Sequence, residues 1–450
     1  MSKTDYNLNV GLEGPISNVL GHGHSLKGIS FWTATVFVVG EVAGGGILSL
    51  AHATAQAGWS GLGIIVYCAI LAAIAGIALA KCWLILEERY PEYRHGLTRK
   101  PFSTIGYHAF GNWASAFVSL LINITRIGAG TVFLLLTSNM IHTLTKQAIH
   151  LSNCEWIPIV AVVMLLPMWL RSPADFWPVA YSAMISSVVG TVLLIINCAL
   201  EISKHGMAKD FHVDGLETWA SAFGTILFAF GGASAFPNFQ NDMKEKDKFP
   251  RAVILGYIAL LCLYLPIAVL GYAAMGFNAS ESIIDDLGTG AIITIVEICF
   301  FIHCGTVIFI VINPTFLDLE ELFNVPKPFS WKRALLRTAI LILMTFIGET
   351  FPSFGQILDL IGSTTVALLS FVLPLVFYVK LVWDQEKNLD WPQRKLPAYV
   401  VFLFVLLVIT AIVGGFSSAF STLKHWTPLD AACYISGSGS ASSYNETLHK

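Results

Sequence analysis

The sequence predicts an all-α protein that crosses a membrane about eleven times, and three observations lead to this fold class. Hydrophobic residues make up 55% of the 450 residues and charged residues only 12%, whereas soluble globular chains hold about 45–50% and about 25%. The apolar residues form continuous runs of the length, about 20 residues, that crosses a bilayer as a helix. Two of these runs are interrupted by consecutive glycines.

The same composition excludes several classes of protein. A chain this apolar is neither an ordinary soluble enzyme nor a disordered chain. The net charge of −3 leaves no basic surface for nucleic acid. A porin-type barrel would alternate apolar and polar residues in segments of about 10. We find no zinc-ligand spacing, phosphate-binding loop or catalytic serine motif. We therefore expect no enzyme activity, no metal and no organic cofactor, only an ion that is coupled to transport.

Polar segments and segments with glycine or proline bound the apolar runs and divide the chain into eleven expected helices. The first run is too long for a cleaved signal peptide and is expected to start membrane insertion. The fourth run has only fifteen residues. We expect a cytoplasmic segment over 1–28, a transmembrane transporter domain over 29–425 and an extracellular or lumenal tail over 426–450. The expected helices cover 30–54, 61–86, 113–142, 156–170, 177–200, 219–242, 251–275, 289–317, 332–349, 354–383 and 397–421.

The distribution of basic residues predicts the orientation. With the N-terminus in the cytoplasm, twenty of the 26 lysines and arginines fall on the cytoplasmic side, five fall outside, and Arg126 lies within the third helix. Such a bias is typical of cytoplasmic connections. On this topology the glycosylation motifs at Asn278 and Asn445 lie outside. Cys154 and Cys433 also lie outside the predicted helices and could form a disulfide.

The glycines predict that the first and sixth helices are broken. The first contains Gly44, Gly45 and Gly46, and the sixth contains Gly231 and Gly232 with Pro237 close behind. Each glycine weakens a helix by about 1 kcal/mol, and unwound backbone within a membrane survives only where it lines a cavity or is buried in protein. The breaks lie at matching positions of two five-helix halves, which is typical of transporters built from inverted repeats. The alternative is close helix packing through small residues.

Broken helices suit a zwitterionic substrate. The N-terminus of a half-helix presents amides with partial positive charge to a carboxylate, and freed carbonyls can hold an ammonium group or a cation. Four ionisable residues within the helices are candidates for ion coupling: Glu41, Arg126, Glu297 and His303. One arginine cannot neutralise two glutamates, so one acid is expected to carry a proton. Glu41 is favoured because it adjoins the first break. Glu297 could instead reach solvent at a helix end, and His303 could be a hydrogen-bonded core residue.

Two segments carry a resemblance to a known family. The stretch GEVAGGGILSLA at 40–51, followed by AQAGW at 55–59, resembles the first helix of the amino acid/auxin permease family, especially its plant-type members. The stretches FAFGG at 228–232 and FPNFQ at 236–240 are similar to the family's sixth helix. The family implies a leucine-transporter-type fold of ten core helices plus one, and amino acid transport driven by protons or, in some branches, sodium. One departure is Ala51-His52, where many relatives carry proline, which affects the outer part of the first helix.

The resemblance also implies a substrate site. Gly44 to Gly46 would bind the carboxylate end of the substrate, and the segment from Phe228 to Gly232 would face its amino group and side chain. The expected substrate-binding residues are Val42, Gly44, Gly45, Gly46, Phe228, Ala229, Phe230, Gly231 and Gly232.

The leading hypothesis is a proton-coupled symporter of amino acids that works by alternating access, in the plasma membrane rather than a vesicular or lysosomal one. Sodium coupling is the first alternative, and it would use carbonyls of the Gly40–Ala43 region with hydroxyls such as that of Thr306. An amino acid sensor of the same fold is the second. The expected partners are an amino acid substrate and the lipid bilayer, with no nucleic acid. The sequence predicts no particular protein partner.

Overall fold

The computed structural model describes residues 28–95, 98–169, 177–213, 215–288, 290–326, 330–384, 396–424 and 432–436. Within these ranges nearly all regular structure is helical, and the one β-bridge joins Ile29 to Met243. The predicted all-α class is therefore confirmed. The predicted segment over 1–28 lies outside the described residues except for Gly28, and the tail over 426–450 lies outside them except for 432–436, so Asn445 is not placed.

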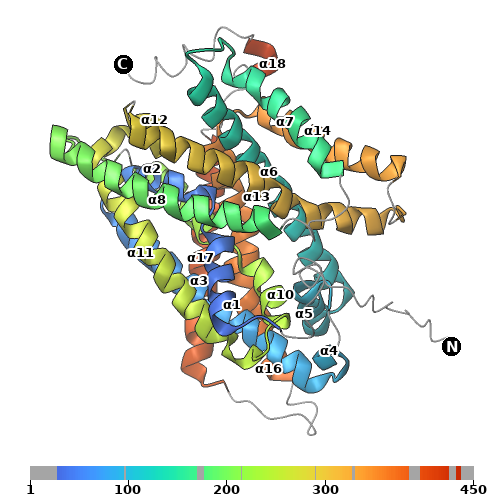
Figure 1. Ribbon diagram of the computed structural model, residues 1–450. Coiled ribbons are helices and arrows are strands. Elements are labelled where there is room, and N and C mark those ends of the chain that lie inside the picture. The colour runs from blue at the N-terminus through green and yellow to red at the C-terminus, as the bar shows by residue number, and fades with distance from the viewer. Residues whose placement is uncertain are drawn as a thin grey trace.

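Each of the eleven predicted ranges contains a helix (Figure 1). The first range holds α1 (Phe31–Val42), η1 (Gly45–Ser49) and α2 (Leu50–Ala57), and the sixth holds α9 (Leu216–Ala229), η3 (Ala233–Ala235) and α10 (Phe236–Asn241). The tenth holds α15 (Phe354–Ile361), the π-helical η6 (Gly362–Val372) and α16 (Leu373–Trp383). The other long helices are α3 (Ser60–Arg89), α6 (Asn112–Thr145), α7 (Asn153–Trp169), α8 (Trp177–His205), α11 (Phe249–Met275), α13 (Ala291–Leu322), α14 (Trp331–Thr350) and α17 (Ala398–Lys424).

The described residues contain eight helices that are long and apolar enough to cross a membrane, or nine if α1 is joined to η1 and α2, which bend away from it by 52°. Two predicted spans are not among them. α7 has only 17 residues, and α14 carries Lys332, Arg333, Arg337 and Glu349 within 20 residues. The number eleven therefore stays a prediction, while a multi-pass membrane protein is confirmed.

Short helices occupy the two ends of the bundle. Figure 1 shows α2, α12 (Ile283–Asp286) and α18 (Cys433–Ser436) towards one end, and α1, α4 (Glu92–His95), α5 (Pro101–Phe110), α10 and α16 towards the other. Between these ends α1, α2, α3 and α8 pack around α11, α9 packs against α2 and η1, and α6 and α8 pack against α13. α17 packs against α9 and η6. The two broken helices thus meet inside the bundle.

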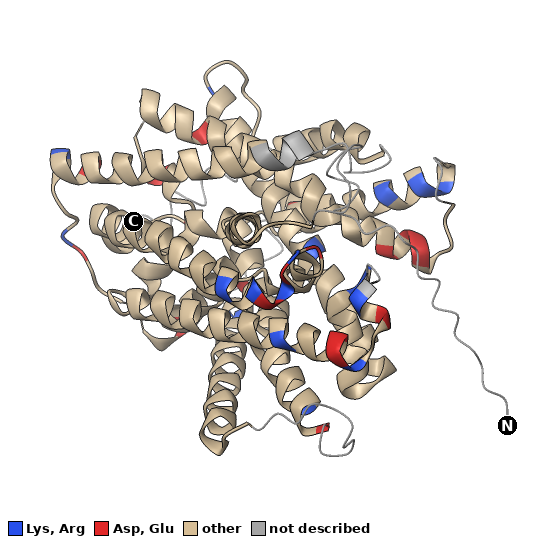
Figure 2. Cartoon of the chain, turned by 60° about the horizontal axis from the view of Figure 1, so that its bottom comes forward, with Lys and Arg blue, Asp and Glu red and all other residues tan. Residues whose placement is uncertain are grey.

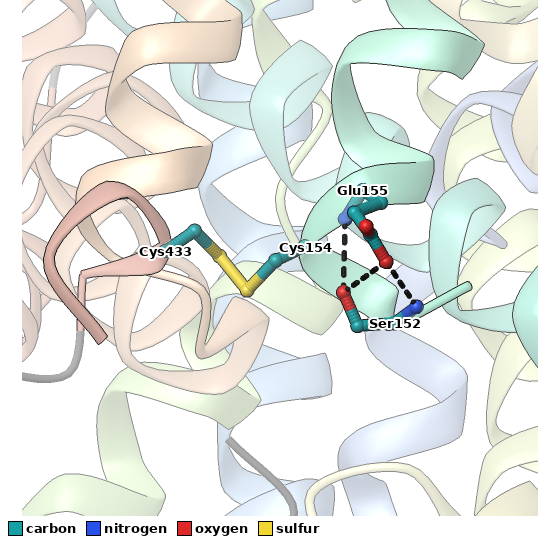
Figure 3. Close-up of a disulfide and its surroundings, with 4 residues drawn as sticks. All are labelled: Ser152, Cys154, Glu155 and Cys433. Carbon is teal, nitrogen blue, oxygen red and sulfur yellow. Dashed lines mark hydrogen bonds between the residues drawn. A yellow bond between two sulfur atoms is a disulfide. The ribbon is translucent and has the colours of Figure 1, made fainter. Parts of the chain in front are cut away.

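A disulfide confirms one pairing that the sequence left open. Cys154 near the start of α7 is bonded to Cys433 of α18, with 5.5 Å between their Cα atoms (Figure 3). α7 begins here because Ser152 and Glu155 form a capping box: the carboxylate of Glu155 accepts from the amide (2.7 Å) and hydroxyl (2.9 Å) of Ser152. The bond requires both cysteines on one side of the membrane, as the predicted topology does, and disulfides persist in oxidising compartments.

Charged residues gather at the end of the bundle opposite the disulfide. In Figure 2 that end is turned forward, and the blue and red residues lie mainly there while most of the long helices are tan. This distribution agrees with the predicted cytoplasmic side. At the other end Asn278 is exposed in η5 (Gly276–Asn278), so it is accessible to the predicted glycosylation.

Candidate functional site

The first break is a short unwound step between two half-helices. α1 ends at Val42, and the amide of Gly44 turns back to the carbonyl of Val42 (2.8 Å) instead of continuing the helix. Gly44 is extended, and η1 starts at Gly45. The amides of Gly45 and Gly46 stand at a helix start, where no acceptor exists within the helix. The break therefore presents polarised amides near the middle of the membrane domain.

The second break depends on the backbone of Gly232. α9 ends at Ala229, Phe230 caps it, and Gly232 has a φ of +135° before η3 begins. This φ is open to glycine but strained for residues with a Cβ. A Cβ on Gly232 would also lie 2.9 Å from Cγ2 of Val42 and 3.2 Å from Cγ of Glu41. The second break therefore lies directly against the end of α1.

The two breaks also touch on their outer side. A Cβ on Gly46 would lie 2.8 Å from the Cα of Ala229. The missing side chain of Gly46 therefore serves the close packing of η1 on α9, as the packing alternative proposed. It does not leave room for a carboxylate, so only the amide of Gly46 remains for a ligand. The rings and methyl groups that face Gly44 and Gly45 belong to Phe133 and Leu136 of α6.

Hydroxyl groups satisfy several of the freed carbonyls. The hydroxyl of Tyr264 on α11 lies 2.9 Å from the carbonyl oxygen of Val42 and 3.0 Å from that of Ala229, so its proton is shared between the two broken helices. Tyr257, two turns earlier, donates to the carbonyl of Phe230 (3.2 Å). Ser187 of α8 donates to the carbonyl of Ala43 (3.3 Å). These carbonyls are thus less available to a cation than the sequence suggested.

We expect the change Tyr264→Phe to lower the uptake rate about tenfold. This factor corresponds to a rise of about 1.4 kcal/mol in the barrier to transport, caused by the disturbed geometry of the site. The ring stays in place, and only the hydroxyl that joins the two breaks is removed. Leaving a buried carbonyl without its donor costs about 1–3 kcal/mol. Thermal unfolding of the purified protein measures the loss of stability, and substrate uptake by proteoliposomes measures the loss of transport.

Tyr272→Phe is the matched control for this prediction. Tyr272 is also fully buried on α11, but its hydroxyl reaches only the carbonyl of Phe211, at 3.4 Å in the outer loop. We expect its uptake to stay near that of the wild type. Equal losses in the two variants would show that the bridge between the breaks has no special role.

The ionisable residues are only partly brought together. Glu41 is the next-to-last residue of α1, and its side chain is exposed beside Gly232. Arg126 makes its ion pair with Asp318 of α13 (3.8 Å), which also contacts Lys100 (3.1 Å). Arg126 interacts electrostatically with Asp318 and, more weakly, with Glu41. Among the described residues no ion pair within 4.0 Å joins Arg126 to Glu41 or to Glu297.

His303 and Glu297 lie apart from this pair. His303 is buried on α13, where Nδ1 lies 2.9 Å from the carbonyl of Ala183, and its Nε2 has no hydrogen-bond partner. Its ring is 6.2 Å from that of Phe133, which faces the first break. Glu297 is buried two turns from the outer end of α13, and Lys146 is the charge that acts on it. The four candidates therefore do not form one cluster.

Sequence reasoning missed four residues of the site. Tyr257 and Tyr264 are seven residues apart on one face of an apolar helix, and this spacing could have indicated a shared polar role. Asp318 was excluded because the eighth helix was predicted to end at 317, whereas α13 continues to Leu322. Ser187 carried no signal, because serine is common in transmembrane helices.

The known proteins that this chain resembles in sequence are amino acid transporters, as predicted. The model of a family described as transmembrane amino acid transporter protein matches residues 27–417. Among similar curated proteins, the amino acid transporter AVT3C of Arabidopsis thaliana is 23% identical over 426 residues, covering 90% of this chain and 94% of the relative. Amino acid permease 1 of the same plant is 24% identical over 464 residues, covering 91% and 94%.

Two similar solved structures are crystal structures of the manganese transporter of Eremococcus coleocola. One is bound to an aromatic bis-isothiourea compound and has a TM-score of 0.53 with 14% identity, covering 91% of this chain and 92% of the other. The second, of a mutant, has a TM-score of 0.55 with 13% identity, covering 97% and 95%. The likeness confirms the predicted fold class and nothing finer. The breaks in the first and sixth helices are seen in this structure itself. The described residues contain no group of three or more potential metal ligands.

Proposed function

Because the chain belongs to the transmembrane amino acid transporter family, we propose that it is a secondary active symporter that couples amino acid transport to protons by alternating access. Membrane amino acid transport follows from the family and from its transporter relatives. The coupling ion, the mechanism and the site residues are our proposal.

The observation that carries the proposed site is the meeting of the two breaks. The carboxylate of the substrate would lie at the start of η1, where the amides of Gly45 and Gly46 have no acceptor within their helix. The segment from Phe228 to Gly232 would face the amino group and side chain. Phe228, Gly231 and Gly232 are half-buried, so they keep surface for a ligand.

Two features support protons over sodium. The carbonyls of Val42 and Ala43, which a sodium ion would use, already accept hydrogen bonds from Tyr264 and Ser187. The hydroxyl of Thr306 bonds back to its own helix at the carbonyls of Ile302 (2.6 Å) and His303 (3.0 Å). Glu41, in contrast, is an acid with exposed surface beside the second break, and we take it as the proton-binding group.

Uptake by proteoliposomes tests this function. A panel of labelled amino acids is offered with a proton gradient alone, a sodium gradient alone, or neither. We expect accumulation under the proton gradient only. Accumulation under the sodium gradient alone would show that sodium, and not the proton, is the coupling ion. Substrate binding without uptake would favour the sensor alternative. Imaging of the tagged protein in cells tests the plasma membrane, which stays a prediction.

A further inference from the structure

A buried acid outside the predicted site joins the sixth and tenth helices. Asp359 of α15 is only 6% exposed. One of its carboxylate oxygens accepts a hydrogen bond from the hydroxyl of Ser221 on α9 (2.7 Å), and the other accepts from Thr225 one turn further on. Ionisable residues at such depth in a membrane domain are rare and usually functional.

Among the described residues no basic side chain forms an ion pair with this carboxylate. α15 packs against α6, α9, η6 and α17. The ionisable groups on these elements are Arg126 and His142 of α6, Glu217 of α9, and Tyr399 and Lys424 at the two ends of α17, while η6 has none. Arg126 pairs with Asp318 and Lys424 with Glu217. Nδ1 of His142 contacts the carbonyl of Leu151. In the described ranges no ion pair within 4.0 Å reaches Asp359.

The loop before α12 supplies one more acid. Glu281 accepts hydrogen bonds from the hydroxyl of Ser353 (2.6 Å) and the amide of Gly355 (3.0 Å) at the start of α15. Its negative charge opposes a second negative charge on Asp359. In the part of the chain that the structure describes, Asp359 therefore has hydroxyl donors and a nearby acid but no cationic partner.

A second buried acid, Glu320, differs from Asp359 in having basic partners. Glu320 of α13 is 7% exposed and accepts from Nε of Arg333 (2.9 Å) and from Nε of Arg337 (2.7 Å). Guanidinium groups only donate, so these partners suit a carboxylate and oppose a protonated acid. Hydroxyl groups both donate and accept, so Ser221 and Thr225 can hold Asp359 with or without a proton.

We propose that Asp359 is a proton-binding residue of the transport cycle, which sets the pH dependence of transport through the contact between α9 and α15. A proton from water adds to one carboxylate oxygen, and one of the two hydroxyls reverses to accept it. The charge on this contact thereby changes from negative to neutral. Since α9 continues into the second break, the protonation of Asp359 acts through α9 on the substrate site. This inference rests on the proposed proton-coupled function.

The test is substrate exchange in proteoliposomes at equal pH on both sides, so that no gradient or protein orientation matters. Rates are measured over about pH 5–8, where protonation of tuned acids is observed. Asparagine has the shape of the neutral acid. We expect exchange by Asp359→Asn to be active and to keep only the weaker pH dependence that Glu41 contributes, while the wild type changes several-fold. Asp359→Glu again carries a carboxyl group, so its exchange rate should depend on pH as that of the wild type does.

Two further variants keep the test decisive if Asp359→Asn does not fold. Thr225→Val removes one donor to the carboxylate, so the midpoint of the pH profile should rise by about one unit. Thr225→Ser keeps the hydroxyl and should leave the midpoint unchanged. A profile of Asp359→Asn or Thr225→Val that overlays the wild type would overturn the inference, as would wild-type exchange that ignores pH. Failure of the proposed function is seen separately, as wild-type protein that does not accumulate substrate under a proton gradient.

Discussion

Replacing Gly46 with alanine should reduce amino acid uptake by more than tenfold. The added Cβ would lie 2.8 Å from Cα and 3.0 Å from Cβ of Ala229. Such distances force η1 away from α9, and the shift would pull the two breaks off the shared hydroxyl of Tyr264. Overpacking of this kind costs about 1–3 kcal/mol. Uptake at equal membrane expression and thermal unfolding measure the two effects, and Gly46→Leu should abolish uptake.

Gly63→Ala is the matched control. Gly63 lies in the first turn of α3, and a Cβ there would meet nothing within 4 Å. Because alanine favours a helix over glycine by about 1 kcal/mol, this variant should be as active as the wild type and equally or more stable. Normal uptake by Gly46→Ala would show that transport does not depend on the close packing of the two breaks.

The change Glu41→Gln should abolish accumulation driven by a pH gradient while leaving substrate exchange. Glutamine has the shape of the protonated acid but cannot release a proton. With one proton per substrate, a gradient of one pH unit supports about tenfold accumulation, and this ratio should fall to about one. Exchange should persist, because the site beside Gly232 keeps its shape. Labelled substrate in proteoliposomes measures both quantities.

Glu297→Gln serves as the comparison for Glu41→Gln. Glu297 lies two turns from the outer end of α13, away from both breaks, and is influenced by Lys146. We expect this variant to accumulate substrate normally. If Glu297→Gln loses accumulation and Glu41→Gln keeps it, the coupling roles are reversed. If both variants accumulate substrate, neither glutamate carries the proton, and Asp359 becomes the leading acid.

The course of the chain through the membrane could be predicted closely. All eleven predicted ranges contain helices, and both interruptions occur at the predicted glycines. The boundaries were less accurate: α13 extends five residues beyond its predicted end, to Leu322. That error matters, because it hid Asp318, the ion-pair partner of Arg126. The end of a helix cannot be predicted from hydrophobicity when its last turn consists mainly of polar residues beyond the apolar run.

The partners of the polar groups could not be predicted. The sequence showed only that Arg126 can neutralise no more than one of two glutamates, and the structure gives Arg126 an ion pair with Asp318. The freed carbonyls were expected to be open to a cation, and several are bonded to Tyr264, Tyr257 and Ser187. Asp359 was not singled out, although it lies within the predicted helix over 354–383 as the four candidates lie within theirs. What the sequence does not show is which hydroxyls face it.

The class of protein, the path of the chain and the position of both breaks could be read from the amino acids alone, because each depends on local composition. Transfer of a segment into lipid follows from its own apolar residues, and a glycine weakens the helix in which it lies. Three further features are seen only in the folded protein: Gly46 packs on Ala229, Tyr264 bridges two broken helices, and Asp359 has hydroxyl partners. These facts depend on which helices are neighbours and how each is rotated. Within the membrane interior a buried polar group is stabilised by the partner that a neighbouring helix supplies, and that partner can lie more than a hundred residues away in the chain.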